Sequence, residues 1–357
     1  MTTSNLAQNI LSQAESLSGV LRYQHRDGAE ALAAAATLLR SGRRVLITGI
    51  GASLYASIPL EYALCSAGID ATAIEAGELL HYRAAGIRDA VAVVVSRSGE
   101  SVEITKLLEI LKARNTVIGV SNEPQSPLAR NAEIGIHIGS LPDEIVAIQT
   151  YTGTLLTLHL LVSAVNHAGD AAAEAIESLL PSFAAAVSGS MEKLSQWDGF
   201  FSGASPVYLL ARGPSCASAY EGALLMNEVA KTPAIGIPAA SFRHGPVEIV
   251  DSKFSGIVFT PRGRTQDLNL ALLQDLVRFG AQIRVIGASP ADSASAVQGY
   301  DPTPVPEPLA PLFEIVPVQA AALRLAELRG ISPGSFRYAP QVTRDEANFN
   351  HGGRNGK

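Results

Sequence analysis

The chain has 357 residues, of which 47% are hydrophobic and 17% are charged. These ordinary globular proportions exclude a wholly disordered or fibrous chain, and the length is sufficient for two domains that each bury a core. The formal net charge of −6 argues against general nucleic-acid binding, which normally needs a basic surface. A local backbone site can still bind a small anion against that net charge.

The first residues and the cysteine usage are those expected of a cytoplasmic protein. The N-terminal segment lacks the basic stretch and apolar run of a secretory signal, and we find no run of about 18 apolar residues, so we expect no membrane contact. Cys65 and Cys216 lie in apolar or small-residue segments, which is typical of buried free thiols. The seven histidines show no ligand spacing, so we predict no metal and no cofactor.

Strands and helices are predicted to alternate along the first half of the chain. Helical spacing over Asn5–Arg40 predicts helices ahead of the first sheet. The apolar strand VLITGIGAS runs into a turn with Gly51 and Ser53, and the strand AVAVVVSRSGES and the strand VIGVSN follow. The unbroken apolar run 91–95 indicates a strand buried on both faces. An Ala-rich stretch at about 170–196 predicts linking helices before the second half.

The second half repeats four landmarks of the first half in the same order. The matched pairs are Gly51 with Gly213, His81 with His244, Gly99 with Gly263, and Gly119 with Gly287, at offsets of 162, 163, 164 and 168 residues. So small a drift in the offset indicates a duplicated chain. Each half alternates strands and helices, so we predict an α/β protein with two tandem, doubly wound parallel-sheet domains and flanking helices.

The same pattern predicts the domain boundaries. We expect N-terminal helices over residues 1–40, a first domain over 41–168, linking helices over 169–197, a second domain over 198–331 and a C-terminal tail over 332–357.

Two turns in the first half are candidates for an anion site. Ser96, Ser98 and Ser101 surround Gly99, which is more hydroxyl groups than one helix cap requires. The alternative is simple capping of the following helix by Ser101. The turn with Ser53 follows a neighbouring strand, and turns that meet at the carboxyl edge of such a sheet bind ligands. Together the two turns favour a phosphate site. In the second half, the GRT turn with Arg262 and Arg264 could hold an anion or be a solvated turn.

The ordered set GAS, SRSGES, EGALLMNEVAK and FRHGP resembles the double sugar-isomerase-domain (SIS) family. This family includes the isomerase half of glucosamine-6-phosphate synthase, deaminases of amino-sugar phosphates, and enzymes that split phosphorylated fructosyl-amines. The resemblance covers almost the whole chain, and it implies the doubly wound fold. It implies phosphate binding by Ser53, Ser96, Ser98 and Ser101, with Gly51, Arg97, Gln149 and Gln341 as further substrate-site candidates.

The resemblance also implies that Glu228 and His244 are catalytic. A carboxylate can carry a proton between carbons next to a carbonyl or imine, and a histidine can help to open the sugar ring. Taken from the residues alone, Glu228 is either a surface charge or a largely buried carboxylate on a helical face, and His244 lies in a loop. The family pattern further implies a homodimer in which His244 serves the neighbouring subunit's site.

Several positions depart from the family pattern. Gln341 stands where a lysine normally precedes Val-Thr, and its neutral amide cannot form a Schiff base. Ser241 replaces a glutamate of the histidine motif, Tyr151 stands where many members have lysine, and Arg97 stands where the synthases have glutamine. Thr2 rather than a cysteine follows Met1, so we expect no glutamine-hydrolysing domain.

The function predicted is an enzyme that isomerises, deaminates or deglycates an (amino)sugar phosphate through a 1,2-enediol or enamine. The absence of the family lysine at position 341 slightly favours a reaction that removes an amine. The alternative is a non-catalytic sugar-phosphate sensor or regulator, although the sequence shows no basic helix-turn-helix domain for DNA binding. A dinucleotide-dependent oxidoreductase is the weakest alternative, because GIGAS lacks the full glycine series and that reading leaves the duplication unexplained.

Overall fold

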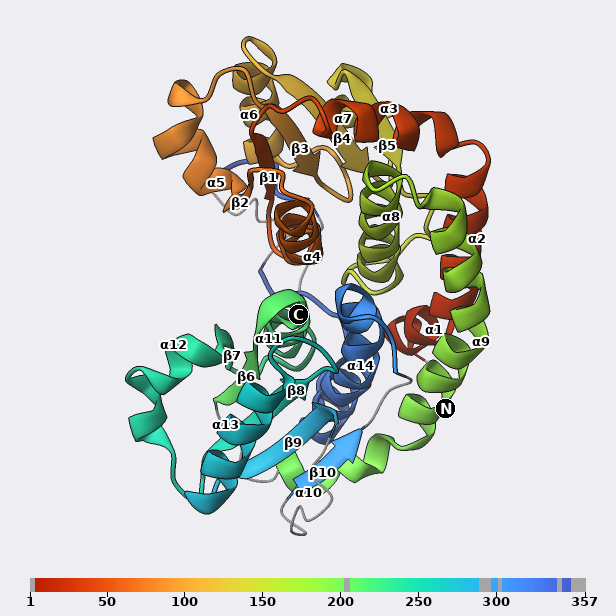
Figure 1. The fold of residues 1–357 in the computed structure, drawn as a ribbon. Coiled ribbons are helices and arrows are strands. Elements are labelled where there is room, and N and C mark those ends of the chain that lie inside the picture. Colours follow the sequence, from red (N-terminus) through yellow and green to blue (C-terminus); the bar gives the residue numbers. More distant parts are fainter. Residues whose placement is uncertain (1–3, 202–205, 289–296, 301–303, 339–341, 348–357) are drawn as a thin grey trace, which may run out of the picture. The chain divides into compact units, whose positions relative to one another are not determined.

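The computed structural model describes residues 4–201, 206–288, 297–300, 304–338 and 342–347. The chain divides into two compact units, and each unit contains one five-stranded sheet (Figure 1). We call the unit of residues 16–177 and 335–357 the first domain, and the unit of residues 1–15 and 178–334 the second domain. The predicted α/β class with two tandem parallel-sheet domains is confirmed.

The first sheet has the strand order β2-β1-β3-β4-β5, with every pair parallel. Its strands are β1 (Val45–Gly49), β2 (Ala71–Glu75), β3 (Val91–Val95), β4 (Thr116–Ser121) and β5 (Ile134–His137). The helices of this domain are α3 (Ala29–Leu39), α4 (Ala52–Ser66), α5 (Ala76–Glu78), η1 (Leu79–Arg83), η2 (Ala84–Gly86), α6 (Val102–Lys112), α7 (Pro127–Asn131) and α8 (Gln149–Val165). Two further helices, α2 (Gln13–His25) and α9 (Gly169–Glu192), each contain a boundary between the two units.

The strand order reverses between β1 and β3, because the chain moves from β1 to β2 on one side and then returns to β3 on the other. Such a switch point leaves two neighbouring strand ends that diverge into turns, and ligands bind there in doubly wound sheets. The turns after β1 and β3 are the two turns that the sequence singled out.

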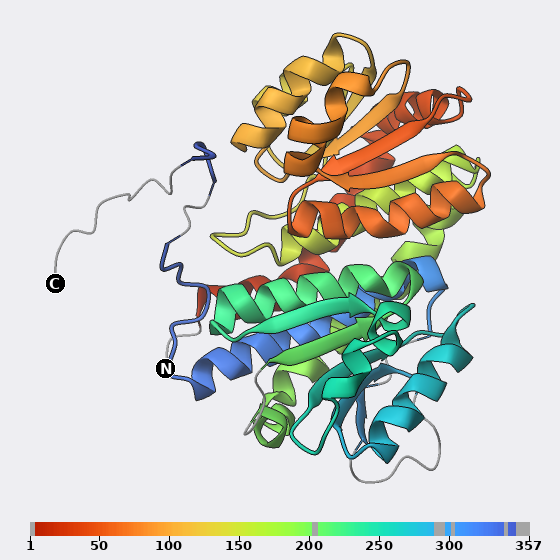
Figure 2. The ribbon, with the colours of Figure 1, turned by 90° about the vertical axis from the view of Figure 1, so that its left-hand side faces the viewer.

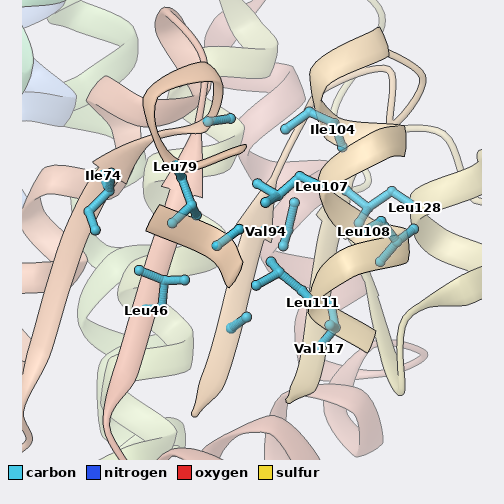
Figure 3. Packing of buried hydrophobic residues seen from close by; sticks show 13 residues of the cluster. Leu46, Ile74, Leu79, Val94, Ile104, Leu107, Leu108, Leu111, Val117 and Leu128 are labelled. Carbon is cyan, nitrogen blue, oxygen red and sulfur yellow. The ribbon is translucent and has the colours of Figure 1, made fainter. Parts of the chain in front are cut away.

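Two fully buried apolar strands position the turns at the switch point. All five residues of β1 and of β3 are buried, as expected for strands covered by helices on both faces. Helix α6 places Ile104, Leu107, Leu108 and Leu111 on one face of the sheet, at helical spacing, where they pack with Val94 (Figure 3). Helices α4 and α8 pack against each other, and α4 packs on β1 and β2.

The second sheet has the order β10-β9-β8-β6-β7, which repeats the first topology. Its strands are β6 (Val207–Ala211), β7 (Ala234–Pro238), β8 (Ser255–Thr260), β9 (Gln282–Gly287) and β10 (Val297–Tyr300). The helices of this domain are α1 (Asn5–Leu11), η3 (Leu194–Trp197), α10 (Asp198–Phe201), η4 (Gly213–Ser215), α11 (Cys216–Ala230), α12 (Ala239–Arg243), η5 (Pro246–Ile249), α13 (Gln266–Arg278), η6 (Glu307–Leu309) and α14 (Ala310–Leu328). The predicted duplication is therefore present in the structure.

The two faces of the second sheet are covered by different helices. On one face, Phe242 of α12 and Leu272 of α13 share a core cluster with Phe254. Helix α11 packs against α14 on the other face, and Figure 2 shows this pair, green and blue, across the sheet from the cyan α13.

Helix α14 and η6 form a stretch, 307–328, that is long and apolar enough to cross a membrane by length and composition. Our inspection of the sequence did not detect this stretch. Its most apolar window is 94% buried inside the protein, which is the burial of a core helix.

One carboxyl group is buried within this apolar helix. The Glu314 side chain is 1% exposed, and its two oxygens accept hydrogen bonds from the hydroxyls of Ser215, at 2.8 Å, and Ser218, at 2.9 Å. Burial raises the pKa of Glu314 to about 7; the two hydrogen bonds lower it by less, and the charge of nearby Glu307 raises it further.

The raised pKa of Glu314 predicts a pH-dependent stability. As the pH rises from the ordinary glutamate value of 4.5 toward 7, the unfolded state loses this proton before the folded state does. The free energy of unfolding should therefore fall over that window, by roughly 3 kcal/mol, and level off above it. Glu314→Gln cannot titrate and should remove this decline, measured by urea unfolding at about pH 5 and about pH 8.

The matched control is Glu327→Gln, an exposed position on the same helix, which should keep the wild-type decline. An unchanged decline in Glu314→Gln would show that another group causes it.

Candidate functional site

The turn after β3 is built from serine side chains that bond to its own backbone. Ser96 is buried, and its Oγ accepts a hydrogen bond from the Gly99 N–H at 3.1 Å. The Oγ of Ser98 accepts one from the Glu100 N–H at 3.3 Å. Gly99 has a φ of +63°, and a Cβ there would lie 2.2 Å from Ser126 Oγ, so both the backbone and the packing require glycine.

Ser101 stands at the N-cap of α6, but its side chain makes no capping hydrogen bond. The first N–H of the helix, from Val102, is instead bound by the backbone oxygen of Thr343 at 3.0 Å. Simple capping, the alternative reading of this serine, is therefore not what its hydroxyl does in the structure. The hydroxyl lies beside a helix N-terminus, where an anion is stabilised.

The turn after β1 adjoins this serine-rich turn. Gly51 has a φ of +52° and precedes α4, and Ser53 lies partly buried in the first turn of that helix. A Cβ on Gly49 would lie 2.9 Å from the Val95 oxygen, so the ends of β1 and β3 approach closely. The serine-bearing turns after β1 and β3 are thus neighbours at the switch point of the first sheet.

A pocket of about 280 Å³ opens beside the turn after β3. It is lined by Arg97, Ser98, Glu100, Asn122, Glu123, Gln125, Ser126, Pro142, Asp143, Thr150 and Val342. Arg97 and Ser98 are the two predicted site residues in this lining. Ser96 lies behind the turn, and Ser53, Ser101, Gly51 and Gln149 lie outside the lining.

Two of the predicted residues hold the pocket wall. The Nη1 atom of Arg97 donates a hydrogen bond to the Ile145 oxygen at 3.0 Å. Gln149 is 3% exposed, and its Nε2 donates to the Pro142 oxygen at 2.9 Å. Both side chains therefore fix the loop between β5 and α8.

Asp143 organises the same wall, and the sequence reading missed it. This carboxylate is 6% exposed and accepts the backbone N–H groups of Ile148, Gln149 and Thr150, at 2.9, 3.1 and 2.9 Å. It also accepts the Thr150 hydroxyl at 2.5 Å. Burial raises the pKa of Asp143, while these hydrogen bonds lower it by less. The signal in the sequence is an acidic residue directly after Pro142 and ahead of an apolar helix.

The described part of the C-terminal tail, 342–347, is tied to the first domain beside the pocket. Arg344 pairs with Glu100 at 2.7 Å. Glu346 accepts hydrogen bonds from Lys106 and from His81, the latter at 2.8 Å. His81, the first-half counterpart of His244, thus contacts the tail, and the predicted residue Gln341 lies outside the described residues.

The two predicted catalytic residues lie in the second domain. Glu228 is partly buried near the end of α11, and its backbone oxygen accepts a hydrogen bond from Lys231 Nζ. His244 is exposed at the end of α12. Because α11 and α12 cover opposite faces of the second sheet, one chain does not bring these residues together within this domain.

Among the described residues, no group of three or more His, Cys, Asp or Glu side chains is arranged to hold a metal ion.

Comparison with known proteins follows the same division into two halves. The SIS domain model matches residues 38–164 and again 200–328. A glutamine–fructose-6-phosphate aminotransferase of Pyrococcus horikoshii is 27% identical over 309 residues, which cover 84% of this chain and 51% of that protein. The chain thus spans about half the length of this curated relative.

Two solved structures share the fold. Glucosamine-6-phosphate deaminase of Thermotoga maritima is 19% identical, with a TM-score of 0.75 and coverage of 95% of this chain and 99% of that one. Tagatose-6-phosphate ketose/aldose isomerase of Escherichia coli is 19% identical, with a TM-score of 0.77 and coverage of 93% and 94%. The two matched segments make up well over half of the chain, which therefore belongs to the SIS domain family.

Proposed function

We propose that this protein is an enzyme that binds an (amino)sugar phosphate and transfers a proton between its first two carbons. The reaction is an isomerisation, a deamination or a deglycation through a 1,2-enediol or enamine. The observation that carries the proposal is the turn after β3, where Arg97 and Ser98 line a pocket and Ser101 stands at the N-terminus of α6. Its setting is the cytoplasm, with no cofactor.

The relatives support this class of reaction. Their names describe amino transfer to fructose 6-phosphate, deamination of glucosamine 6-phosphate, and a tagatose 6-phosphate ketose/aldose isomerisation. Each name contains a sugar 6-phosphate. Because this chain spans about half of the aminotransferase, we propose the sugar-phosphate chemistry and leave out the use of glutamine.

In this proposal the first domain binds the phosphate group. Backbone N–H groups at the start of α6, with the hydroxyls of Ser98, Ser101 and Ser53, supply donors to an anion. Ser96 shapes the turn through its bond to Gly99. Arg97 contributes positive charge from the pocket wall, where its position is fixed by the bond to Ile145.

The proton transfer is assigned to Glu228. Its carboxylate removes a proton from the carbon beside a carbonyl or imine and returns it to the neighbouring carbon by way of the enediol or enamine. In a deamination or deglycation the transfer leaves an imine, and water then adds to its C=N bond so that the C–N bond breaks and the amine leaves. His244 assists ring opening by protonating the ring oxygen. With a glutamine at position 341, no enzyme amine is available there, and a substrate that already carries nitrogen fits this departure.

We further propose that the active unit is a homodimer in which His244 completes the neighbouring subunit's site. The position of α11 and α12 on opposite faces of the second sheet supports this arrangement, because a second subunit can then supply the histidine.

The phosphate site can be tested by removing two hydroxyls. Ser53→Ala together with Ser98→Ala should weaken sugar-phosphate binding by about ten- to a hundredfold per hydroxyl, because a hydrogen bond to a charged group contributes roughly 1.5–3 kcal/mol. Calorimetric titration with fructose 6-phosphate and glucosamine 6-phosphate measures the change. The control is Ser188→Ala, whose hydroxyl bonds only within an exposed helix. Equal affinities in the wild type and the double variant would refute the assignment of these two hydroxyls to phosphate binding.

The carbon base can be tested by a substitution that keeps the shape of the side chain. Glu228→Gln should lower turnover by about 10² to 10⁴, with substrate affinity nearly unchanged, because the amide cannot accept the proton. Turnover and binding are measured separately, and Glu327→Gln serves as a control at an exposed glutamate of the same domain. Near-normal turnover in Glu228→Gln would refute its role as the base.

The shared site can be tested by complementation. Two inactive proteins, Glu228→Gln and His244→Ala, should regain part of the activity when they are mixed and allowed to exchange subunits, because one mixed dimer carries one intact site. Labelled subunits monitor the exchange. A monomer by light scattering, or full exchange without recovered activity, would contradict the shared site.

A further inference from the structure

The second sheet has its own switch point, between β6 and β8. The turns that leave it are η4 after β6 and the Gly263–Arg264 turn after β8, which leads into α13. They are the counterparts of the two turns at the first switch point. By topology alone, this edge is a second place for an anion.

A carboxylate of the chain already lies there. The Oε2 atom of Glu307 accepts the backbone N–H of Arg264 at 3.2 Å. A Cβ added to Gly263 would lie 2.3 Å from Glu307 Cδ, and one added to Gly213 would lie 3.8 Å from Glu307 Oε1. The carboxylate thus sits between the two turns, directly against the glycine of one of them.

Two serine hydroxyls near this switch point also have a carboxylate of the chain as their hydrogen-bond partner. Ser215 and Ser218, at the start of α11, both donate to Glu314. Glu314 follows Glu307 by seven residues, which is about two helical turns. One helical stretch therefore supplies both carboxylates that occupy this edge.

An acidic residue occupies the same repeat position in both domains, but it binds different partners in each. Pro142-Asp143 recurs as Pro306-Glu307, 164 positions later, the same offset as Gly99 and Gly263. The shorter Asp143 turns to the N–H groups of its own helix α8. Glu307, with one more methylene, reaches the turn after β8 instead.

We propose that Glu307 is the internal occupant of a second anion site, so that it closes the switch point of the second sheet to free phosphate. A carboxylate attached to the chain competes with free phosphate at a high effective concentration. Removing the Glu307 carboxylate leaves the backbone N–H of Arg264 and the space beside Gly263 open to inorganic phosphate. The inference rests on the second domain alone and does not depend on the function proposed above.

The experiment counts phosphate ions per chain by equilibrium dialysis with labelled inorganic phosphate. Glu307→Ala should bind one phosphate per chain more than the wild type. Glu307→Gln keeps an oxygen that can accept the Arg264 N–H, so it should bind the wild-type number. Glu327→Ala, at an exposed glutamate of the following helix α14, is the matched control and should also be unchanged.

A second substitution locates the new site. Gly263→Ala adds a Cβ where the carboxylate lay, so Glu307→Ala with Gly263→Ala should return to the wild-type count. If Glu307→Ala does not fold, Glu307→Ser, which keeps a small acceptor, is measured in its place.

Each outcome decides the proposal. An unchanged count in Glu307→Ala, or an additional phosphate that persists in the double variant, overturns it. Two phosphates on the wild-type chain would also overturn it. If the wild type binds none and Glu307→Ala binds one, the inference stands while the first-domain site of the proposed function fails.

Discussion

Unsatisfied backbone N–H groups at the carboxyl edges of two parallel sheets are the constraint on which this structure depends. Where a strand turns sharply into a helix, the first N–H groups have no partner within the helix and attract negative charge. The chain satisfies this demand differently in its two halves. The first domain gathers serine hydroxyls and keeps a pocket beside the turn after β3, whereas the second places its own carboxylates at the edge.

The proposed phosphate site is compatible with the chain's net charge of −6. Two of the three acidic residues that line the pocket are engaged: Asp143 is bound by three backbone N–H groups, and Glu100 is paired with Arg344. Their charge is thus partly compensated locally. The local arrangement of donors, rather than the net charge, decides which anion is stabilised at this edge.

Sequence alone predicted the parts that depend on local pattern. The apolar run 91–95 and the recurring glycine turns were sufficient for the α/β class and the duplication, because buried strands and sharp turns leave their mark in consecutive residues. The roles of Asp143 and Glu307 depend on bonds whose geometry consecutive residues do not reveal. Gln149 was predicted as a substrate-site residue, yet it lies outside the pocket lining, and its amide donates a hydrogen bond to the lining residue Pro142. The roles of Glu228 and His244 stay predictions.

The central claim is that this fold moves a proton on a phosphorylated sugar, and NMR in deuterated water tests it most directly. The protein is incubated with a panel of hexose 6-phosphates, amino-hexose 6-phosphates and phosphorylated fructosyl-amino acids, and the products are followed by proton and carbon spectra. We predict that at least one compound is converted and gains solvent deuterium at C1 or C2. Tight binding of these compounds with neither conversion nor deuterium would contradict the claim, and it would favour a sugar-phosphate sensor.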